Sequence, residues 1–216
     1  MFGFFKKKLD ILGSVSKYLP SDPVIVEAGA HNGTDSVRMA KFWPDSKVHA
    51  FEPIPNLYDE LQENSESFPN IYPHKLALGG VTGQTEIYIS SGTSDASSSL
   101  LKPKQHLTQH PTVRFEESLM VDVITIDEWA KRNSINKIDF FWLDLQGYEM
   151  AALQHATSVL DKATAIYTEV NLTELYEGCP LYEEFKAWLE TQGFTVLAEG
   201  IYWEDAGNVL FIREQL

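Results

Sequence analysis

Two patterns of apolar and polar residues alternate along the chain, one typical of strands and one typical of helices. Runs in which apolar residues are contiguous or alternate with polar ones, as in strands, occupy residues 23–29, 46–52, 70–78, 83–90, 119–126, 137–145, 164–170, 194–200 and 208–214. Stretches in which apolar residues recur every three or four positions, as on one face of a helix, lie between them at residues 35–43, 54–66, 127–133, 148–160 and 180–193.

This alternation predicts an α/β fold. Helices of about ten residues between strands act as crossover connections, so most strands are parallel and helices cover both faces of one sheet. The last two apolar runs are joined by a short loop, which predicts an antiparallel hairpin. Residues 90–117 are rich in Ser, Thr, Gln, His and Pro without a sustained period, which predicts a long loop or lid.

Composition narrows the class of protein. The chain has 216 residues, enough for one well-buried domain, which we place at residues 22–216. Its 17 basic and 31 acidic side chains give a net charge of -14, which disfavours nucleic acid and anionic lipid as partners. The single cysteine, Cys179, has no partner for an internal disulfide or a thiolate zinc site. We therefore expect a cytoplasmic protein that acts on a small molecule.

Residues 1–21 precede the first strand and mix aromatic, apolar and lysine side chains. No uninterrupted apolar segment approaches the roughly 20 residues that a membrane-spanning helix requires. The apolar side chains that can share one face of a helix here are Phe4, Phe5, Leu9, Ile11 and Leu12. We predict a helical extension that docks on the domain or on a partner, with peripheral contact to a membrane surface as the alternative.

The end of the first predicted strand carries Glu27, Gly29 and Gly33. Ligands of parallel α/β sheets bind at such strand ends, where Gly29 allows a sharp turn and Gly33 allows close approach to the helix start. Glycines at such a joint also serve packing alone. His31 stands where a dinucleotide-binding loop has its second glycine, so the pattern does not favour a pyrophosphate.

The end of the second strand carries Glu52, about 20 residues beyond Gly29. A carboxylate at this spacing is placed to accept hydrogen bonds from both hydroxyls of a ribose, although capping of the next helix is a structural alternative. Pro53 follows and stiffens the exit from the strand. A ligand with a ribose but no pyrophosphate, beside acidic groups that suit an ammonium, indicates S-adenosylmethionine.

Six motifs together point to a family. In chain order they are VIVEAGAHNG, HAFEPIPNLYDEL, KLALGG, SSSLL, VDVITIDEW and KIDFFWLDLQGYEMAALQHA. Their order and spacing resemble the FkbM-type S-adenosylmethionine-dependent methyltransferases from Val24 to Val170, and residues 167–194 are similar to one branch of that family. The resemblance implies the class I methyltransferase fold, a Rossmann-like three-layer sandwich with a seven-stranded, mostly parallel sheet. It also implies methyl transfer to hydroxyl oxygens of sugars and natural products.

The resemblance implies roles for single residues. Glu27 lies near the amino group of S-adenosylmethionine, Glu52 binds the ribose, and the backbone of Ala77 and Leu78 borders the adenine. The residues that we predict as cofactor contacts are Glu27, Gly29, Ala30, His31, Gly33, Glu52, Pro53, Ala77, Leu78 and Asp144.

The chain departs from the family pattern at three positions. Glu27 replaces the usual aspartate, His31 replaces the usual asparagine, and Gln146 stands where an acidic residue is usual. The change at Gln146 leaves one carboxylate fewer beside Asp144, so a mechanism that uses that carboxylate is in doubt for this chain.

An O-methyltransferase must align a hydroxyl oxygen with the methyl carbon and help to remove its proton. We predict Asp144 and His31 as the catalytic residues, with Glu149 and Glu169 as alternative bases. No metal site is predicted. Asp144, Glu169 and Asn171 nevertheless form an all-oxygen set of the kind that binds magnesium, so a metal-assisted variant stays open.

Two other functions remain as alternatives. Tyr182 and Lys186 have the spacing that short-chain, nicotinamide-dependent dehydrogenases use for proton transfer, and a methyltransferase fold without activity would only bind a partner. For the methyltransferase, the polar segment 90–117 predicts a sugar or another polyhydroxylated acceptor. We interpret His106 and His110 in that segment as loop residues rather than metal ligands.

Overall fold

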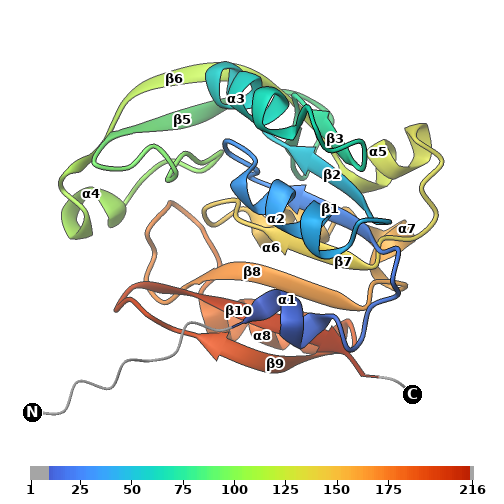
Figure 1. Ribbon diagram of the computed structural model, residues 1–216. Coiled ribbons are helices and arrows are strands. Elements are labelled where there is room, and N and C mark those ends of the chain that lie inside the picture. Colours follow the sequence, from blue (N-terminus) through green and yellow to red (C-terminus); the bar gives the residue numbers. More distant parts are fainter. Residues whose placement is uncertain (1–9, 215–216) are drawn as a thin grey trace, which may run out of the picture.

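The computed structural model describes residues 10–214, and residues 1–9 and 215–216 lie outside the description. Its centre is a sheet ordered β3-β2-β1-β7-β8-β10-β9, in which β10 alone runs antiparallel to its neighbours (Figure 1). The strands are β1 (Val24–Ala28), β2 (Lys47–Phe51), β3 (Ile71–His74), β7 (Phe140–Leu143), β8 (Ala165–Asn171), β9 (Phe194–Gly200) and β10 (Ala206–Arg213). The predicted mostly parallel sheet with a C-terminal hairpin is confirmed.

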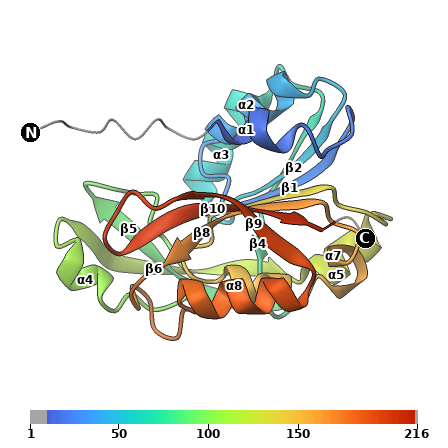
Figure 2. The same cartoon turned by 90° about the horizontal axis from the view of Figure 1, so that it is seen from below.

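Helices cover both faces of this sheet (Figure 2). On one face lie α1 (Ile11–Val15), α2 (Thr34–Phe42) and α3 (Pro55–Ser65), and on the other α5 (Ile126–Arg132), α6 (Glu149–Leu153), α7 (Thr157–Leu160) and α8 (Tyr182–Thr191). Because strand side chains alternate, Phe140 and Trp142 pack on the α1–α3 face while Phe141 and Leu143 pack on the other. Burial of each such side chain contributes about 2–3 kcal/mol, which holds the layers together.

Three strands form a second sheet, ordered β4-β6-β5, whose strands β5 and β6 lie beside α3 and above the β3 edge of the first sheet (Figure 1). They are β4 (Ala77–Leu78), β5 (Gly83–Gly92) and β6 (Val113–Ile124). The prediction of one strand over residues 70–78 is therefore wrong, because this run divides between the two sheets. Pro73 has no N–H to donate, and it lies in β3 at the edge of the main sheet, where a strand tolerates proline.

The irregular segment is shorter than the predicted range of 90–117. Strand β5 continues to Gly92 and β6 begins at Val113, so the lid spans residues 93–112. It contains the single helical turn α4 (His106–Gln109). Gly92 has a φ of 84°, and a Cβ there would lie 2.4 Å from the carbonyl oxygen of Thr112, so the lid's two ends touch.

The predicted helix over residues 148–160 is two short helices. Asp127, in the first turn of α5, accepts hydrogen bonds from the backbone amides of Thr157 and Ser158 at 3.0 and 2.8 Å. A carboxylate in this position satisfies the free amides at the start of α7, so a new helix begins there. This cap comes from a residue 30 positions earlier in the sequence, which helical periodicity does not reveal.

The N-terminal extension is described only from residue 10. Asp10 caps α1 by accepting a hydrogen bond from the amide of Gly13 at 3.1 Å, and Ile11 and Leu12 are buried on the α2 face of the sheet. Phe4, Phe5 and Leu9 lie outside the described residues. Within residues 10–214, no helix has both the length and the apolar character needed to cross a bilayer.

Candidate functional site

The joint between β1 and α2 is a tight turn pressed against the end of β7. Gly29 has a φ of 79°, and a Cβ there would lie 2.0 Å from the carbonyl oxygen of Asp144. The amides of Gly29 and Ala30 both donate to the carbonyl of Phe51, at 3.1 and 2.9 Å. Glycine alone fits position 29, because any side chain would collide with the neighbouring strand. The turn therefore fixes the ends of β1, β2 and β7 against one another.

Glu27 is buried beneath α2, with 1% of its surface exposed. Its carboxylate accepts a hydrogen bond from the hydroxyl of Ser36. Burial raises the pKa of Glu27 from 4.5 to about 8, against the opposing effect of the Ser36 hydrogen bond. The charges of Asp35, Glu52 and Asp144 act in the same direction as burial. Glu27 is therefore a protonated core carboxyl near neutral pH.

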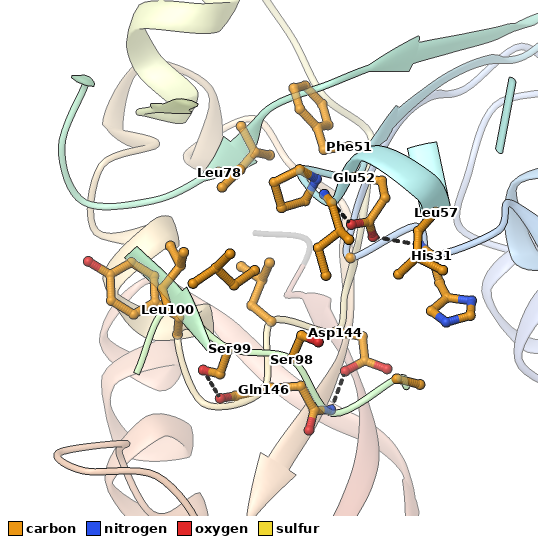
Figure 3. A pocket seen from close by; sticks show the side chains of 18 of the residues that line it. His31, Phe51, Glu52, Leu57, Leu78, Ser98, Ser99, Leu100, Asp144 and Gln146 are labelled. Carbon is orange, nitrogen blue, oxygen red and sulfur yellow. Dashed lines mark hydrogen bonds between the residues drawn. The ribbon is translucent and has the colours of Figure 1, made fainter. Parts of the chain in front are cut away.

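Glu52 follows β2 and lines a pocket at the ends of the strands (Figure 3). Its Oε1 accepts a hydrogen bond from the amide of Ile54 at 2.8 Å, and its Oε2 accepts one from the amide of His31 at 3.0 Å. Burial raises the pKa of Glu52 to about 7, although both hydrogen bonds oppose this rise. Each carboxylate oxygen retains capacity for another hydrogen bond, so the group is fixed in place and able to accept from a ligand.

Apolar side chains line much of the pocket, Glu52 lies beside Phe51 and Leu57, and Asp144 lies farther along, near Ser98 and Gln146 (Figure 3). The apolar and aromatic side chains in the lining include Phe51, Ile54, Leu57, Leu78, Leu100 and Tyr148. Asp144 lies across the pocket from Phe51 and Leu78, and Glu52 lines the pocket at the end of β2. The arrangement suits an elongated ligand with a flat apolar ring, a hydroxylated middle and a charged end.

The lid closes one side of the pocket. Asp95, Ser98, Ser99 and Leu100 line the cavity, and the imidazole Nε2 of His31 lies 3.2 Å from the Asp95 carboxylate. His31 itself has a φ of 50°, a left-handed backbone that is uncommon for a residue with a side chain. The contact joins the turn after β1 to the lid, which the sequence does not show.

Asp144 follows β7 and opens into the pocket, so its side chain is exposed there while protein surrounds it on the other sides. This enclosure raises the pKa of Asp144, although a hydrogen bond from Gln146 opposes the rise. The negative charge of Asp35 also raises it, whereas the nearby His31 lowers it.

Gln146 connects two carboxylates, a tyrosine and the lid. Its Nε2 donates to Asp144 Oδ1 and to Glu169 Oε2, each at 2.6 Å, and its Oε1 accepts from the hydroxyl of Tyr176 at 2.7 Å. The hydroxyl of Ser99 donates to its backbone carbonyl at 2.8 Å (Figure 3). The backbone of Gln146 is left-handed, with a φ of 51°. Four segments therefore meet at one residue, Gln146.

The sequence signals part of this cluster. Glu169 is recognisable as a carboxylate at a strand end, and Gln146 by its departure from the family pattern. Ser99 lies in the SSSLL motif and Tyr176 in the segment 167–194, but neither receives a role from the sequence, because neither the lid nor the loop after β8 has a regular period. Their roles follow only from the folded contacts.

The pocket gathers most of the predicted cofactor residues. Those that line it are Gly29, His31, Glu52, Pro53, Ala77, Leu78 and Asp144. Glu27, Ala30 and Gly33 do not line it. Ala30 is 4% exposed, and Gly33 starts α2 with a φ of 80° beside Leu61 of α3.

The residues considered for another base or for a dehydrogenase do not line the pocket. Glu149 is buried and accepts a hydrogen bond from the amide of Leu145 at 2.8 Å, and burial raises its pKa to about 7. Tyr182 and Lys186 lie on α8, and neither lines the pocket. Tyr182 donates instead to the Glu199 carboxylate.

His106 and His110 belong to α4 and its end, away from the pocket lining. His110 pairs with Asp205 at 2.5 Å, and His106 packs against Tyr176 and Phe115. Across residues 10–214, no group of three or more histidine, cysteine, aspartate or glutamate side chains has an arrangement that could hold a metal ion.

Comparison with known sequences matches the model of the Methyltransferase FkbM domain to residues 27–196. The 2-O-methyltransferase NoeI of Sinorhizobium fredii is 32% identical over 162 residues, covering 73% of this chain and 67% of NoeI. Hexuronic acid methyltransferase AglP of Haloferax volcanii is 23% identical over 163 residues, covering 75% of this chain and 62% of AglP.

Solved structures share the fold. The N-terminal domain of EvdMO1, solved in the presence of SAH and D-fucose, aligns with a TM-score of 0.55 at 13% identity, covering 95% of this chain and 82% of that one. Fibrillarin of Aeropyrum pernix, solved with natively bound S-adenosyl-L-methionine, aligns with a TM-score of 0.50 at 13% identity, covering 93% and 74%. At these identities the likeness concerns the fold.

Proposed function

The chain belongs to the FkbM methyltransferase family and uses S-adenosylmethionine, and from this premise we propose that it methylates a hydroxyl oxygen of a sugar or another small polyhydroxylated acceptor. The observation that carries the proposal is the pocket itself. It combines an apolar end, the fixed carboxylate of Glu52 and the carboxylate of Asp144 in one cavity at the strand ends.

The residues present fit S-adenosylmethionine. Glu52 is oriented to accept from ribose hydroxyls, Leu78 and Leu100 offer apolar contact to an adenine, and Gly29 and Asp144 face the methionine end. When bound, this cofactor supplies an electrophilic methyl group on a sulfonium sulfur. The chain's own residues bind it, exclude water and present the acceptor oxygen to it.

Asp144 is the proposed catalytic carboxylate at this end of the pocket, because it opens into the cavity and Gln146 fixes its orientation. His31 is proposed to act from the other side of the turn. Its pairing with Asp95 favours a role in holding the lid closed over the reacting groups rather than free movement as a base.

Three observations support a sugar acceptor. NoeI is by name a 2-O-methyltransferase, AglP acts on a hexuronic acid, and the EvdMO1 domain was solved with D-fucose present. The lid beside the pocket is also rich in hydroxyl groups, including Ser98 and Ser99. Because Asp144 and Glu169 lie together, we expect neutral sugars to be methylated faster than uronic acids.

Cellular setting and domain organisation are proposals of the same kind. The net charge of -14 supports a small molecule over nucleic acid, and the free, buried thiol of Cys179 is consistent with a cytoplasmic location. We propose residues 22–216 as one domain, with the segment before it docking on that domain through Ile11 and Leu12, which are buried there.

Calorimetry tests the cofactor first. We expect S-adenosylhomocysteine to bind and NAD to show no heat. Binding of NAD alone would indicate a dehydrogenase, and binding of neither would overturn the proposal.

Methyl transfer tests the acceptor. S-adenosylhomocysteine release is measured with methyl glycosides of neutral, amino and uronic sugars, and the product is mapped by NMR. Glu52→Ala is expected to weaken cofactor binding and Asp144→Ala to lower turnover. Methylation of nitrogen in the amino sugar, with no oxygen methylated in any glycoside, would contradict the assignment.

A further inference from the structure

Glu169 lies beside Asp144 but outside the cofactor pocket. Strands β7 and β8 pair in parallel with Leu143 opposite Thr168, so Asp144 and Glu169 are the next residues on each strand. Both side chains leave the sheet on the same face as Trp142 and Tyr167, whose rings lie 4.4 Å apart. Glu169 therefore borders the position where an acceptor would meet the charged end of the pocket.

Gln146 fixes the Glu169 carboxylate toward Asp144. The amide nitrogen donates to both carboxylates at 2.6 Å, while the amide oxygen accepts from Tyr176. With both carboxyls ionised, the reverse amide orientation would place an oxygen against two carboxylate oxygens, so the ionised pair requires the orientation described. The two carboxylates are thus held at one nitrogen, close enough to act on the same ligand.

Glu169 has capacity left for a ligand. Gln146 bonds to Oε2, and among residues 10–214 the structure gives Oε1 no hydrogen-bond partner. The side chain is half-buried, so it is neither sealed in the core nor freely hydrated. Burial, and repulsion by Asp144, Glu149 and Asp205, raise the pKa of Glu169 well above its usual value, so the protonated form is favoured in the ligand-free chain. A cationic ligand beside the group would stabilise the ionised carboxylate, which is the form that accepts a proton.

We propose that Glu169 is a further catalytic residue, the group that receives the proton of the acceptor hydroxyl. The inference rests on the proposed methyl transfer. In that step the acceptor oxygen forms its bond to the methyl carbon while the carbon–sulfur bond breaks, and the bonding pair stays on sulfur. The hydroxyl proton passes to Glu169 Oε1 and from there to solvent. Asp144 then serves the cofactor side of the same reaction centre.

Sinefungin provides a test that needs no acceptor. This analogue of S-adenosylmethionine carries an ammonium in place of the methyl group, so a carboxylate facing that position binds it in preference to S-adenosylhomocysteine. We expect Glu169→Gln to lower the ratio of sinefungin to S-adenosylhomocysteine affinity by about tenfold, as loss of a charge-assisted hydrogen bond would. The affinity for S-adenosylhomocysteine should stay within about twofold of the wild type, which also shows that the variant folds.

Glu204→Gln is the matched control. Glu204 is an exposed carboxylate in the loop between β9 and β10, and its loss removes the same charge without touching the pocket. If Glu169→Gln lowers the ratio of sinefungin to S-adenosylhomocysteine affinity no more than Glu204→Gln does, the proposal for Glu169 is overturned. The proposed function would not be affected by that result. Failure of the wild type to bind S-adenosylhomocysteine would instead overturn the proposed function.

A second variant, Glu169→Asp, tests the proposal if Glu169→Gln fails to fold. If Glu169→Gln does not fold, Glu169→Asp keeps the charge but withdraws it by one methylene group. The ratio should then fall by about threefold or more because the contact lengthens. An unchanged ratio in a folded Glu169→Asp protein would count against Glu169. Where an acceptor has been identified, turnover of Glu169→Gln should fall by about a hundredfold or more.

Discussion

Glu27 makes folding stability depend on pH, and Glu27→Gln removes that dependence. The carboxyl is 1% exposed and carries a pKa of about 8 in the folded chain, against 4.5 ordinarily. Glutamine has the same shape, stays neutral at every pH and still accepts the hydrogen bond of Ser36 through its amide oxygen.

The magnitude follows from the two pKa values. The folded chain holds the Glu27 proton more tightly than the unfolded chain does, so this group's contribution is fully present below about pH 4.5. Between about pH 4.5 and 8 that contribution falls by about 1.4 kcal/mol per pH unit, or about 3 kcal/mol by pH 7. Glu52 and Glu149, with pKa values of about 7, add a loss of the same sign in the wild type. The difference between wild type and variant isolates Glu27.

Urea unfolding of the ligand-free protein at pH 5, 6, 7 and 8, followed by tryptophan fluorescence, measures this difference. We expect the two proteins to be within about 1 kcal/mol of each other at pH 5 and the variant to be about 2–3 kcal/mol more stable at pH 7. Glu60→Gln, at an exposed position of α3, should run parallel to the wild type. Parallel curves for Glu27→Gln as well would show that the carboxyl ionises without cost, and the reasoning from burial would be wrong.

Three further predictions concern the pocket. Glu52→Gln should weaken S-adenosylhomocysteine binding by about tenfold in calorimetry, because the amide nitrogen cannot accept a ribose hydrogen bond; an unchanged Kd would exclude Glu52 from the site. Gly29→Ala should lower stability by about 2 kcal/mol or more in urea unfolding, because its Cβ would meet the Asp144 carbonyl at 2.0 Å; a loss within about 0.5 kcal/mol would show that the strands move apart readily. Gln146→Glu should destabilise the protein by about 2–4 kcal/mol at pH 8 and by less at pH 5, because a third carboxylate must then lie between Asp144 and Glu169; equal losses at both pH values would point to packing rather than charge.

The local pattern of apolar residues predicts the strands of the main sheet, but it does not show which strands belong to a second sheet. Period and apolar runs identify β1, β2, β7 and β8 because each is buried on both faces. They do not identify the second sheet, because the pairing of β4 with β6 joins segments over 40 residues apart. The break between α6 and α7 likewise depends on Asp127, which lies far from it in sequence.

Strand-end reasoning identifies side chains that line the pocket, but it does not separate them from side chains that lie one layer behind the pocket. Glu52 and Asp144 line the cavity as that reasoning expects. Glu27 also ends a strand, but its side chain turns under α2 to Ser36. Side chains alternate between the two faces of a sheet, so the position of a residue in a strand determines its face. Whether the side chain reaches a pocket on that face depends on whether a helix covers it there.

Glutamine at position 146, where the resemblance to the FkbM family implies an acid, gains a meaning from the fold that it lacks in the sequence. A carboxylate at this position has no hydrogen to donate, so three neighbouring acids would compete, and at least one would hold a proton near neutral pH. The amide of Gln146 has two hydrogens and gives one each to Asp144 and Glu169. Its oxygen accepts from the hydroxyl of Tyr176, so these contacts form without a proton shared between carboxylates. Glutamine at position 146 thus leaves the ionised forms of both Asp144 and Glu169 able to accept from a ligand.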